Sequence, residues 1–427
     1  MCCCSLAGPR YLPTAISFRS EHTVRIKKLF PCLVLVLAMN LLWAATAGAQ
    51  TGLTLYNFTG YSDGGNPLSN LVMDAAGNLY GTTFVGGAHG AGEVFELSRG
   101  AGSSWTETVL YSFTGGVDGA NPFYAGVIFD SAGNLYGTTV GGGTLGFGTV
   151  FELSPSGSGW SESVLYSFAG GNDGASPYAG VIFGDGGGLY GTTASGGYYG
   201  QGTVFGLTPG SSGLWTETVI LTFNTNNGGG PLGGLVSDGV NFYGVTEGGG
   251  KYKAGIAYEL APNTSGGWNE SILHSFGKGS DGIDPYAEAL VLDSLGNLYG
   301  TTTAGGAHQA GTVFKLSRNG AGSWGEVVLY SFDGAVASNP FSGVILDGKG
   351  HLYGTCANGN GETTVGSVYE LTAQPSGKWS ERNLLMFTRG NGEFPEAALL
   401  RDAAGNLYGT TTMGGEWNMG VVYEVTP

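Results

Sequence analysis

Four loops that begin with an aspartate supply the most regular set of acidic side chains in the sequence. In each loop a glycine follows the aspartate, and a proline follows three residues after that glycine. The four aspartates are Asp63, Asp118, Asp173 and Asp281. Carboxylate oxygens are the ligands that Ca²⁺ prefers, so such loops could form a ring of cation sites. Each loop supplies only one reliable carboxylate, however, and an Asp-Gly pair is common in tight turns. The aspartates therefore remain candidates for ligand binding, and no metal is expected.

Aromatic residues lie in or beside the same glycine-rich loops. The candidates for ligand binding are Tyr124, Tyr178, Tyr286, Tyr198 and Tyr199, with Phe123 and Phe341 close to them in sequence. An aromatic ring offers a flat surface on which a sugar or an apolar side chain can stack. Binding groups are often found on loops that a rigid scaffold holds in place. These loops therefore predict a face that binds a glycan or a protein.

The other reactive side chains do not form a recognisable catalytic set. His89 and His308 occupy matching positions in two Gly-Gly-Ala-His loops, too many repeats apart to form a metal pair. Cys356 replaces a threonine of the repeat, which is typical of a small core residue. The glycine-rich loops lack the lysine and the following helix of a phosphate-binding loop. We assign no catalytic residue and expect no cofactor.

These loops recur because the chain is built from repeats. The stretch 77–83 reads GNLYGTT and returns about every 55 residues, a period typical of repeat folds. The repeat tyrosines are Tyr80, Tyr136, Tyr190, Tyr243, Tyr299, Tyr353 and Tyr408. Each repeat holds four short runs rich in β-branched and aromatic residues, in the second repeat 126–130, 134–139, 148–153 and 160–168. Such runs between Gly, Asn and Asp predict four β-strands per repeat.

The two ends of the chain predict how the repeats are arranged. A fourth-type strand, Thr54–Phe58, comes before the first repeat, and the last repeat stops after its third strand. A strand in surplus at one end and one missing at the other is what a closed ring needs. We therefore predict an all-β, seven-bladed β-propeller of four-stranded blades, closed by an N-terminal outer strand that completes the last blade. A linear β-solenoid is the alternative, but it would need capping units.

Two repeated positions are predicted to be structural. Asp74 and its equivalents precede the repeat tyrosine, where an aspartate can accept hydrogen bonds from a turn. A tryptophan opens the fourth strand in six repeats, as Trp105, Trp160, Trp215, Trp268, Trp324 and Trp379, and a glutamate follows two positions later. Because each tryptophan holds the same place in its repeat, packing between repeats is favoured over sugar stacking.

Residues 1–49 have the pattern of a signal peptide. Lys27 and Lys28 precede an apolar run from Leu29 to Ala47, and Ala47-Gly48-Ala49 matches a cleavage site. A start near Val24 would give a basic region of ordinary length. Retention of the segment as a signal anchor is the alternative to cleavage. We therefore expect a single domain at 50–427, exported to the periplasm, the cell surface or the medium.

The composition excludes some classes of partner for this domain. The formal net charge is −16, so a nucleic-acid backbone would be repelled. After residues 1–49 only Cys356 remains, which leaves no internal disulfide. We expect a monomer without a membrane span in the mature chain.

The repeat also resembles a known family. The runs GNLYGTT, GG, GTVFEL and WxExVLYSF resemble the GloVer tandem repeat of exported bacterial proteins, often described as choice-of-anchor proteins, and the resemblance spans Leu53 to Pro427. The family has no defined activity, so it implies no catalytic residue. Its members differ in C-terminal sorting signals, whereas this sequence ends directly after a strand, so release is expected rather than anchoring. We expect a binding or scaffold module. The alternatives are a carbohydrate-active or quinoprotein-like propeller enzyme and a purely structural surface protein.

Overall fold

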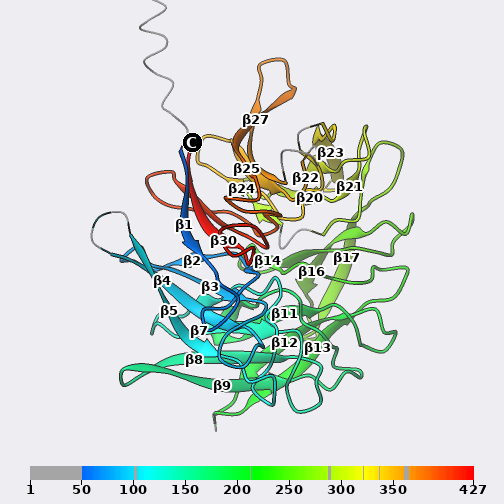
Figure 1. The fold of residues 1–427 in the computed structure, drawn as a ribbon. Helices are drawn as coiled ribbons and strands as arrows, with labels where there is room; N and C mark the ends of the chain where they lie inside the picture. The colour runs from blue at the N-terminus through cyan, green and yellow to red at the C-terminus, as the bar shows by residue number, and fades with distance from the viewer. Residues whose placement is uncertain are drawn as a thin grey trace, which may run out of the picture. The chain divides into compact units, whose positions relative to one another are not determined.

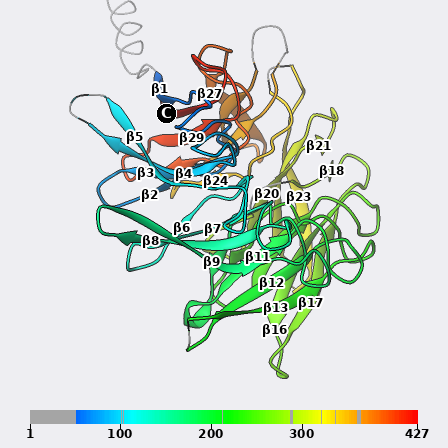
Figure 2. The same ribbon diagram turned by 60° about the horizontal axis from the view of Figure 1, so that its bottom comes forward.

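The computed structural model describes residues 51–427 apart from 101, 103, 212, 287–289, 321, 336 and 360–364. The predicted signal peptide at 1–49 lies outside the described residues. The described chain is a ring of seven four-stranded antiparallel blades, which confirms the predicted β-propeller. Figure 2 shows the blades following one another around the ring from cyan to orange.

The strands of each blade follow the order of the sequence except in the last blade. Blades 1 and 2 contain β2 (Val72–Met73), β3 (Leu79–Thr83), β4 (Glu93–Arg99) and β5 (Trp105–Ser112), then β6 (Ile128–Phe129), β7 (Leu135–Thr139), β8 (Thr149–Ser156) and β9 (Gly159–Ser167). Blades 3 and 4 contain β10 (Ile182–Phe183), β11 (Leu189–Thr193), β12 (Thr203–Pro209) and β13 (Trp215–Thr222), then β14 (Val236–Ser237), β15 (Phe242–Thr246), β16 (Ile256–Pro262) and β17 (Trp268–Ser275). Blades 5 and 6 contain β19 (Val291–Leu292), β20 (Leu298–Thr302), β22 (Thr312–Arg318) and β23 (Trp324–Ser331), then β24 (Ile345–Leu346), β25 (Leu352–Cys356), β26 (Ser367–Ala373) and β27 (Trp379–Met386). Blade 7 contains β28 (Leu400–Arg401), β29 (Leu407–Thr411), β30 (Val421–Thr426) and β1 (Thr51–Asn57). A short pair, β18 (Gly282–Ile283) with β21 (Ala304–Gly305), and one 3₁₀ turn, Asp185–Gly187, complete the described elements.

The N-terminal strand closes the ring as predicted. β1 runs antiparallel to β30, with Thr54 opposite Tyr423 and a bulge between Thr54 and Tyr56. Figure 1 shows this joint, where the blue and red ends of the colour scale meet. The buried Leu55 and Phe58 pack in one cluster with Val422 of blade 7 and Phe95 of blade 1. The strand therefore completes blade 7 and also joins it to blade 1.

The apolar core lies between neighbouring blades. One cluster combines Tyr80 and Phe113 of blade 1 with Leu135 and Phe151 of blade 2, and Trp160 packs against it. Tryptophan also meets the repeat tyrosine of the preceding blade, with 6.2 Å between the ring centroids of Tyr243 and Trp324 and 6.3 Å between those of Tyr190 and Trp268. These contacts confirm that the tryptophan stripe packs between repeats.

The glycine of the second strand makes room for an aromatic ring. A Cβ at Gly81 would lie 2.8 Å from the Phe95 ring and 2.9 Å from Leu71. A side chain there would displace Phe95, which is completely buried. The Gly-Thr-Thr pattern therefore follows from close packing in the middle of the blade.

The first strand of each blade is shorter than the sequence pattern predicts. The run 126–130 yields only Ile128–Phe129 as a strand. A Cβ at Gly126 would lie 1.9 Å from Asn70 Oδ1 of the neighbouring blade, and the Asp130 N–H donates to Asn134 O across the following turn. Crowding between adjacent blades and the early turn therefore limit ladder pairing to two residues.

The aspartate before the repeat tyrosine has the predicted turn role. Asp74 Oδ1 accepts hydrogen bonds from the N–H groups of Ala76 at 2.8 Å and Asn78 at 2.9 Å. Asp74 Oδ2 accepts one from the Tyr80 hydroxyl at 3.1 Å. Burial would raise the pKa of Asp74, but the hydrogen bonds from Asn78 and Tyr80 outweigh it and hold that pKa below its usual value.

Candidate functional site

Two sets of loops meet on one face of the ring, which we call the rim. They are the connection that enters each blade and the loop between its second and third strands. In every blade the two loops are bridged, at Gly65–Val85, Ala120–Gly141, Ala175–Ser195, Gly229–Gly248, Gly282–Gly305, Ser338–Asn358 and Glu393–Met413. Entering loops also bond the blade before them, since Asn121 Nδ2 donates to Phe84 O at 2.9 Å. The rim is therefore a connected scaffold of glycine-rich loops.

The four candidate aspartates lie near the start of the entering loops, shortly after the outer strand of the preceding blade. The Asp118 carboxylate accepts hydrogen bonds from the Tyr111 hydroxyl at 3.0 Å and from the Thr114 N–H at 2.7 Å. Asp63 and Asp173 accept the equivalent tyrosine bonds, each at 3.0 Å, from Tyr56 and Tyr166. Asp281 instead contacts His274. These carboxylates are already engaged within their own loops.

A glutamate from the next blade approaches each of these aspartates. Burial, and then the charge of Asp118, raises the pKa of Glu162 to about 7. Glu107 beside Asp63, and Glu217 beside Asp173, have their pKa raised to about 7 for the same two reasons. The Oε1 atoms of all three glutamates are shielded from solvent and have no hydrogen-bond partner among the described residues. Each such Tyr-Asp-Glu group joins the outer strands of two blades, and we call it a junction.

Not every junction keeps the same residues. Between blades 3 and 4, Asn227 Nδ2 donates to Glu270 Oε2 at 2.8 Å. Between blades 5 and 6, the Tyr330 hydroxyl donates directly to Glu381 Oε2 at 2.8 Å. Between blades 6 and 7, the glutamate position is Gly52, where a Cβ would lie 2.5 Å from Leu385 Cδ1. The polar group therefore varies from junction to junction. An asparagine takes the place of the aspartate beside Glu270, the tyrosine bonds Glu381 directly, and an apolar contact replaces the group at Gly52.

A cavity of about 340 Å³ occupies the centre of the ring. It is lined by residues in or directly before the first strands of all seven blades, with Leu71, Val127, Leu235, Val344 and Leu399 among them. Apart from Asn70 and Tyr124, the described residues that line it carry apolar side chains or are glycines. We call this cavity the channel, and it is an apolar space with few groups for acid–base chemistry.

Aromatic residues gather where the channel meets the rim. Tyr124 lines the channel and lies 5.7 Å, between ring centroids, from Tyr286, which enters a blade three positions further round the ring. Phe123 contacts Tyr178 at 4.9 Å, and Tyr286 contacts Phe341 at 5.2 Å. Since Tyr124 reaches across to other blades, it lies near the ring axis. We call these five aromatic residues the mouth.

Carboxyl groups with raised pKa values lie at and beside the mouth. Burial raises the pKa of Glu396, although hydrogen bonds from Thr412 and Tyr124 oppose this. Burial, followed by the charge of Asp284, raises the pKa of Glu247, and burial also raises that of Asp284. Glu247 and Asp284 line a pocket of about 380 Å³ together with Lys253. Burial, then the charge of Glu247, raises the pKa of Tyr286 to about 12.

The remaining tyrosine candidates lie further out on the rim. Tyr198 and Tyr199 are 74% and 58% exposed, and their rings meet edge to face at 4.9 Å. Tyr61 and Trp417 are also exposed on rim loops. The structure thus brings together Tyr124, Tyr178 and Tyr286 at the mouth and leaves Tyr198 and Tyr199 as a separate exposed pair.

The other residues considered from sequence are accounted for separately. His89 and His308 are exposed on their loops. Cys356 is a free, buried thiol, and burial raises its pKa well above the usual value. Sequence reasoning missed Glu396, Glu247, Asp284 and His274. Two of these depart visibly from the repeat. Glu396 follows the loop proline, where the other entering loops carry an aromatic residue or leucine. His274 replaces a junction tyrosine.

No helix among the described residues is long and apolar enough to span a membrane.

Comparisons with known proteins give one family and several solved structures to which this chain is similar. The comparison with curated proteins gives no match. PorZ, a surface component of the type-IX secretion system of Porphyromonas gingivalis, is 16% identical, with 84% of this chain and 46% of that chain covered and a TM-score of 0.48. A putative 6-phosphogluconolactonase from Bacteroides uniformis is 16% identical, with 78% and 88% covered and a TM-score of 0.48. A luciferin-regenerating enzyme is 13% identical, with 89% and 96% covered and a TM-score of 0.44.

The family model of the Gloeobacter/Verrucomicrobia repeat matches residues 41–158, 103–288 and 265–427. These matches confirm the resemblance drawn from the GNLYGTT pattern and cover the whole ring. The chain belongs to the Gloeobacter/Verrucomicrobia repeat family.

Proposed function

We propose that this protein is an exported binding module that holds a neutral glycan at the mouth of its channel. The observation that carries the proposal is the convergence of Tyr124, Tyr178 and Tyr286 from three different blades on one spot of the rim. The pattern of residues 1–49 and the repeat family support a location outside the cytoplasm. The ring supplies the rigid support on which such a site depends.

The chemistry of the mouth suits a sugar ring. Aromatic residues present apolar surface to the C–H face of a sugar and keep a polar edge for its hydroxyl groups. Glu396 offers carboxyl oxygens at the same place, and its hydrogen bond with Tyr124 fixes its position. With a formal net charge of −16, the protein would repel an anionic polysaccharide, so a neutral one is favoured.

The test is a glycan array probed with the exported protein and with Tyr178→Ala. We expect binding to one group of neutral glycans, and loss of most of that signal in the variant. Leu295→Ala is the control, because Leu295 is 85% exposed in a turn between a first and a second strand, away from the rim. Equal binding by Tyr178→Ala and the unaltered protein would refute a site at the mouth. Capture of a protein with no glycan bound would favour the protein-scaffold alternative.

A second candidate is a glycan-cleaving enzyme, and the pair Glu247 and Asp284 favours it. Two neighbouring carboxyl groups are the usual equipment for general acid–base cleavage of a glycosidic bond, and burial raises the pKa of both Glu247 and Asp284. Release of reducing ends from a bound neutral glycan, abolished by Glu247→Gln, would establish this function. Binding without release supports the binding module.

A further inference from the structure

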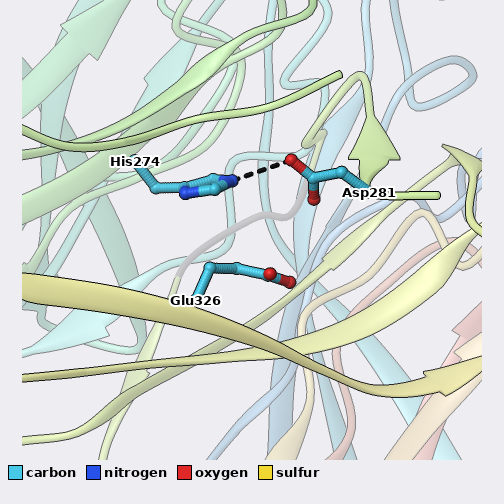
Figure 3. A group of neighbouring side chains, drawn as sticks. All are labelled: His274, Asp281 and Glu326. Carbon is cyan, nitrogen blue, oxygen red and sulfur yellow. Dashed lines mark hydrogen bonds and ion pairs between the residues drawn. The ribbon is translucent and has the colours of Figure 1, made fainter. Parts of the chain in front are cut away.

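The junction between blades 4 and 5 differs from its counterparts in one side chain. His274 stands where Tyr56, Tyr111 and Tyr166 stand in other junctions. Its Nε2 lies 2.8 Å from Asp281 Oδ2, in the place of the tyrosine hydroxyl. Glu326 of β23 completes the group from the next blade, as Figure 3 shows. An imidazole nitrogen thus meets two carboxylates from separate elements.

We propose that His274, Asp281 and Glu326 bind a divalent transition-metal ion, with Zn²⁺ as the best match. One ligand atom from each residue lies within 4.8 Å of the others. A tetrahedral Zn²⁺ with bonds of about 2.0–2.2 Å holds its ligand atoms about 3.4 Å apart. Small side-chain adjustments therefore suffice: the His274–Asp281 contact lengthens slightly and Glu326 moves inward. Imidazole with carboxylate is a ligand set that suits Zn²⁺.

The surroundings hold the ligands in position and leave a path for the ion. The Gly282 N–H donates to Asp281 Oδ1 at 2.7 Å, which leaves Oδ2 directed at His274. The His274 ring packs edge to face on Phe276, with 4.7 Å between centroids. Glu326 Oε1 is shielded from solvent and has no hydrogen-bond partner among the described residues. The His274 side chain is 21% exposed, so solvent can deliver the ion and supply a fourth ligand.

A second histidine beside two acidic residues, His351, is less suited to binding a metal ion. His351 Nδ1 lies 3.0 Å from Asp347 Oδ2 and 3.5 Å from Glu370 Oε1. Arg382 already pairs with Glu370, at 2.7 Å between Nη2 and Oε2. A guanidinium thus supplies the positive charge that a metal would bring. At the His274 junction, no arginine or lysine among the described residues forms an ion pair with Asp281 or Glu326.

The experiment measures zinc bound per chain after treatment with EDTA and titration with Zn²⁺, followed by elemental analysis and thermal unfolding. We expect one Zn²⁺ per chain and a rise in melting temperature on binding, since a ligand specific for the folded state stabilises it. His274→Tyr restores the side chain of the other junctions and should therefore fold. It should lose the bound Zn²⁺ and the zinc-dependent rise, while its melting temperature in EDTA stays near that of the unaltered protein.

Two further variants separate this site from adventitious binding. His351→Asn introduces the residue that most other repeats carry at that position, and it should keep the full zinc stoichiometry. Glu326→Gln should weaken Zn²⁺ binding by at least about tenfold, as loss of a charged ligand does. Absence of bound Zn²⁺ in the unaltered protein, or equal zinc in the unaltered protein and His274→Tyr, would overturn the proposal. None of these outcomes depends on glycan binding.

Discussion

The junctions and the mouth are built from the same kinds of side chain, tyrosines and acids, but they differ in how often they occur. The group Tyr111, Asp118 and Glu162 has close counterparts at Tyr56 and Tyr166 and an altered one at His274. The group of Tyr124, Tyr286 and Glu396 is assembled from three different loops. The junction group recurs with the repeat and serves the packing of blades. At the mouth, Tyr124 and Glu396 depart from the residues that the other entering loops carry, and they meet only near the ring axis. His274 combines both features. It stands at a position that recurs in the junctions, but it is a histidine where the counterparts are tyrosines.

The largest effect is expected at the joint that closes the ring. Removing residues 51–58 leaves β30 as an open edge and exposes the cluster around Val422. We expect loss of the cooperative unfolding transition and aggregation, measured by circular dichroism and size-exclusion chromatography. A folded monomer with a normal melting temperature would refute the account of closure.

A permuted chain sharpens this prediction. Thr51 lies opposite Thr426, so residues 51–58 can be attached after Thr426 through a two-residue Asn-Gly hairpin turn. The permuted protein, beginning at Thr59, should recover the fold because its last blade then has the order of the others. Failure of this chain to fold, while the deletion also fails, would mean that β1 acts through more than its pairing with β30.

A smaller effect is expected when one junction loses its acceptor. Asp118→Ala leaves the Tyr111 hydroxyl and the Thr114 N–H without their carboxylate. We expect the free energy of unfolding to fall by about 2–3 kcal/mol, measured with urea. Tyr178→Ala at the mouth is the comparison and should cost less than half as much, since Tyr178 is only half buried. Equal losses would remove the distinction between junction and mouth.

A still smaller effect is expected from the pH dependence of stability at a junction, and its direction can be predicted. The pKa of Glu162 is raised to about 7 in the folded protein by burial and by Asp118, from an ordinary value of 4.5, so folding favours the protonated acid. Its contribution to stability is complete below 4.5 and is lost as the pH rises through about 7. The groups that face it are Asp118 and, through that residue, Tyr111. Glu162→Gln should therefore unfold like the unaltered protein at pH 4 and at a higher temperature at pH 8.

Thermal scans of the two proteins at both pH values check this. A stability difference that is the same at pH 4 and pH 8 would mean that folding does not raise the pKa of Glu162.

The features of the molecule that could be predicted from the sequence are those that a comparison of the repeats reveals. The surplus strand Thr54–Phe58 implies closure, and the constant place of Trp160 in its repeat implies packing between blades; both are observed. The mouth could not be assembled from sequence, because Tyr124 meets Tyr286 only when loops from blades three positions apart converge on the axis. The short first strands were also missed, since the crowding of Gly126 against Asn70 arises between blades rather than within one.

The most direct test of the central claim is the dissociation constant for the best-bound neutral glycan, measured by calorimetry for Tyr178→Ala and Glu162→Gln beside the unaltered protein. The account predicts about a tenfold weakening for Tyr178→Ala, the worth of one aromatic contact of about 1.4 kcal/mol, and no change for Glu162→Gln. Unchanged affinity in Tyr178→Ala together with weakened affinity in Glu162→Gln would place the ligand at the junctions and contradict the account.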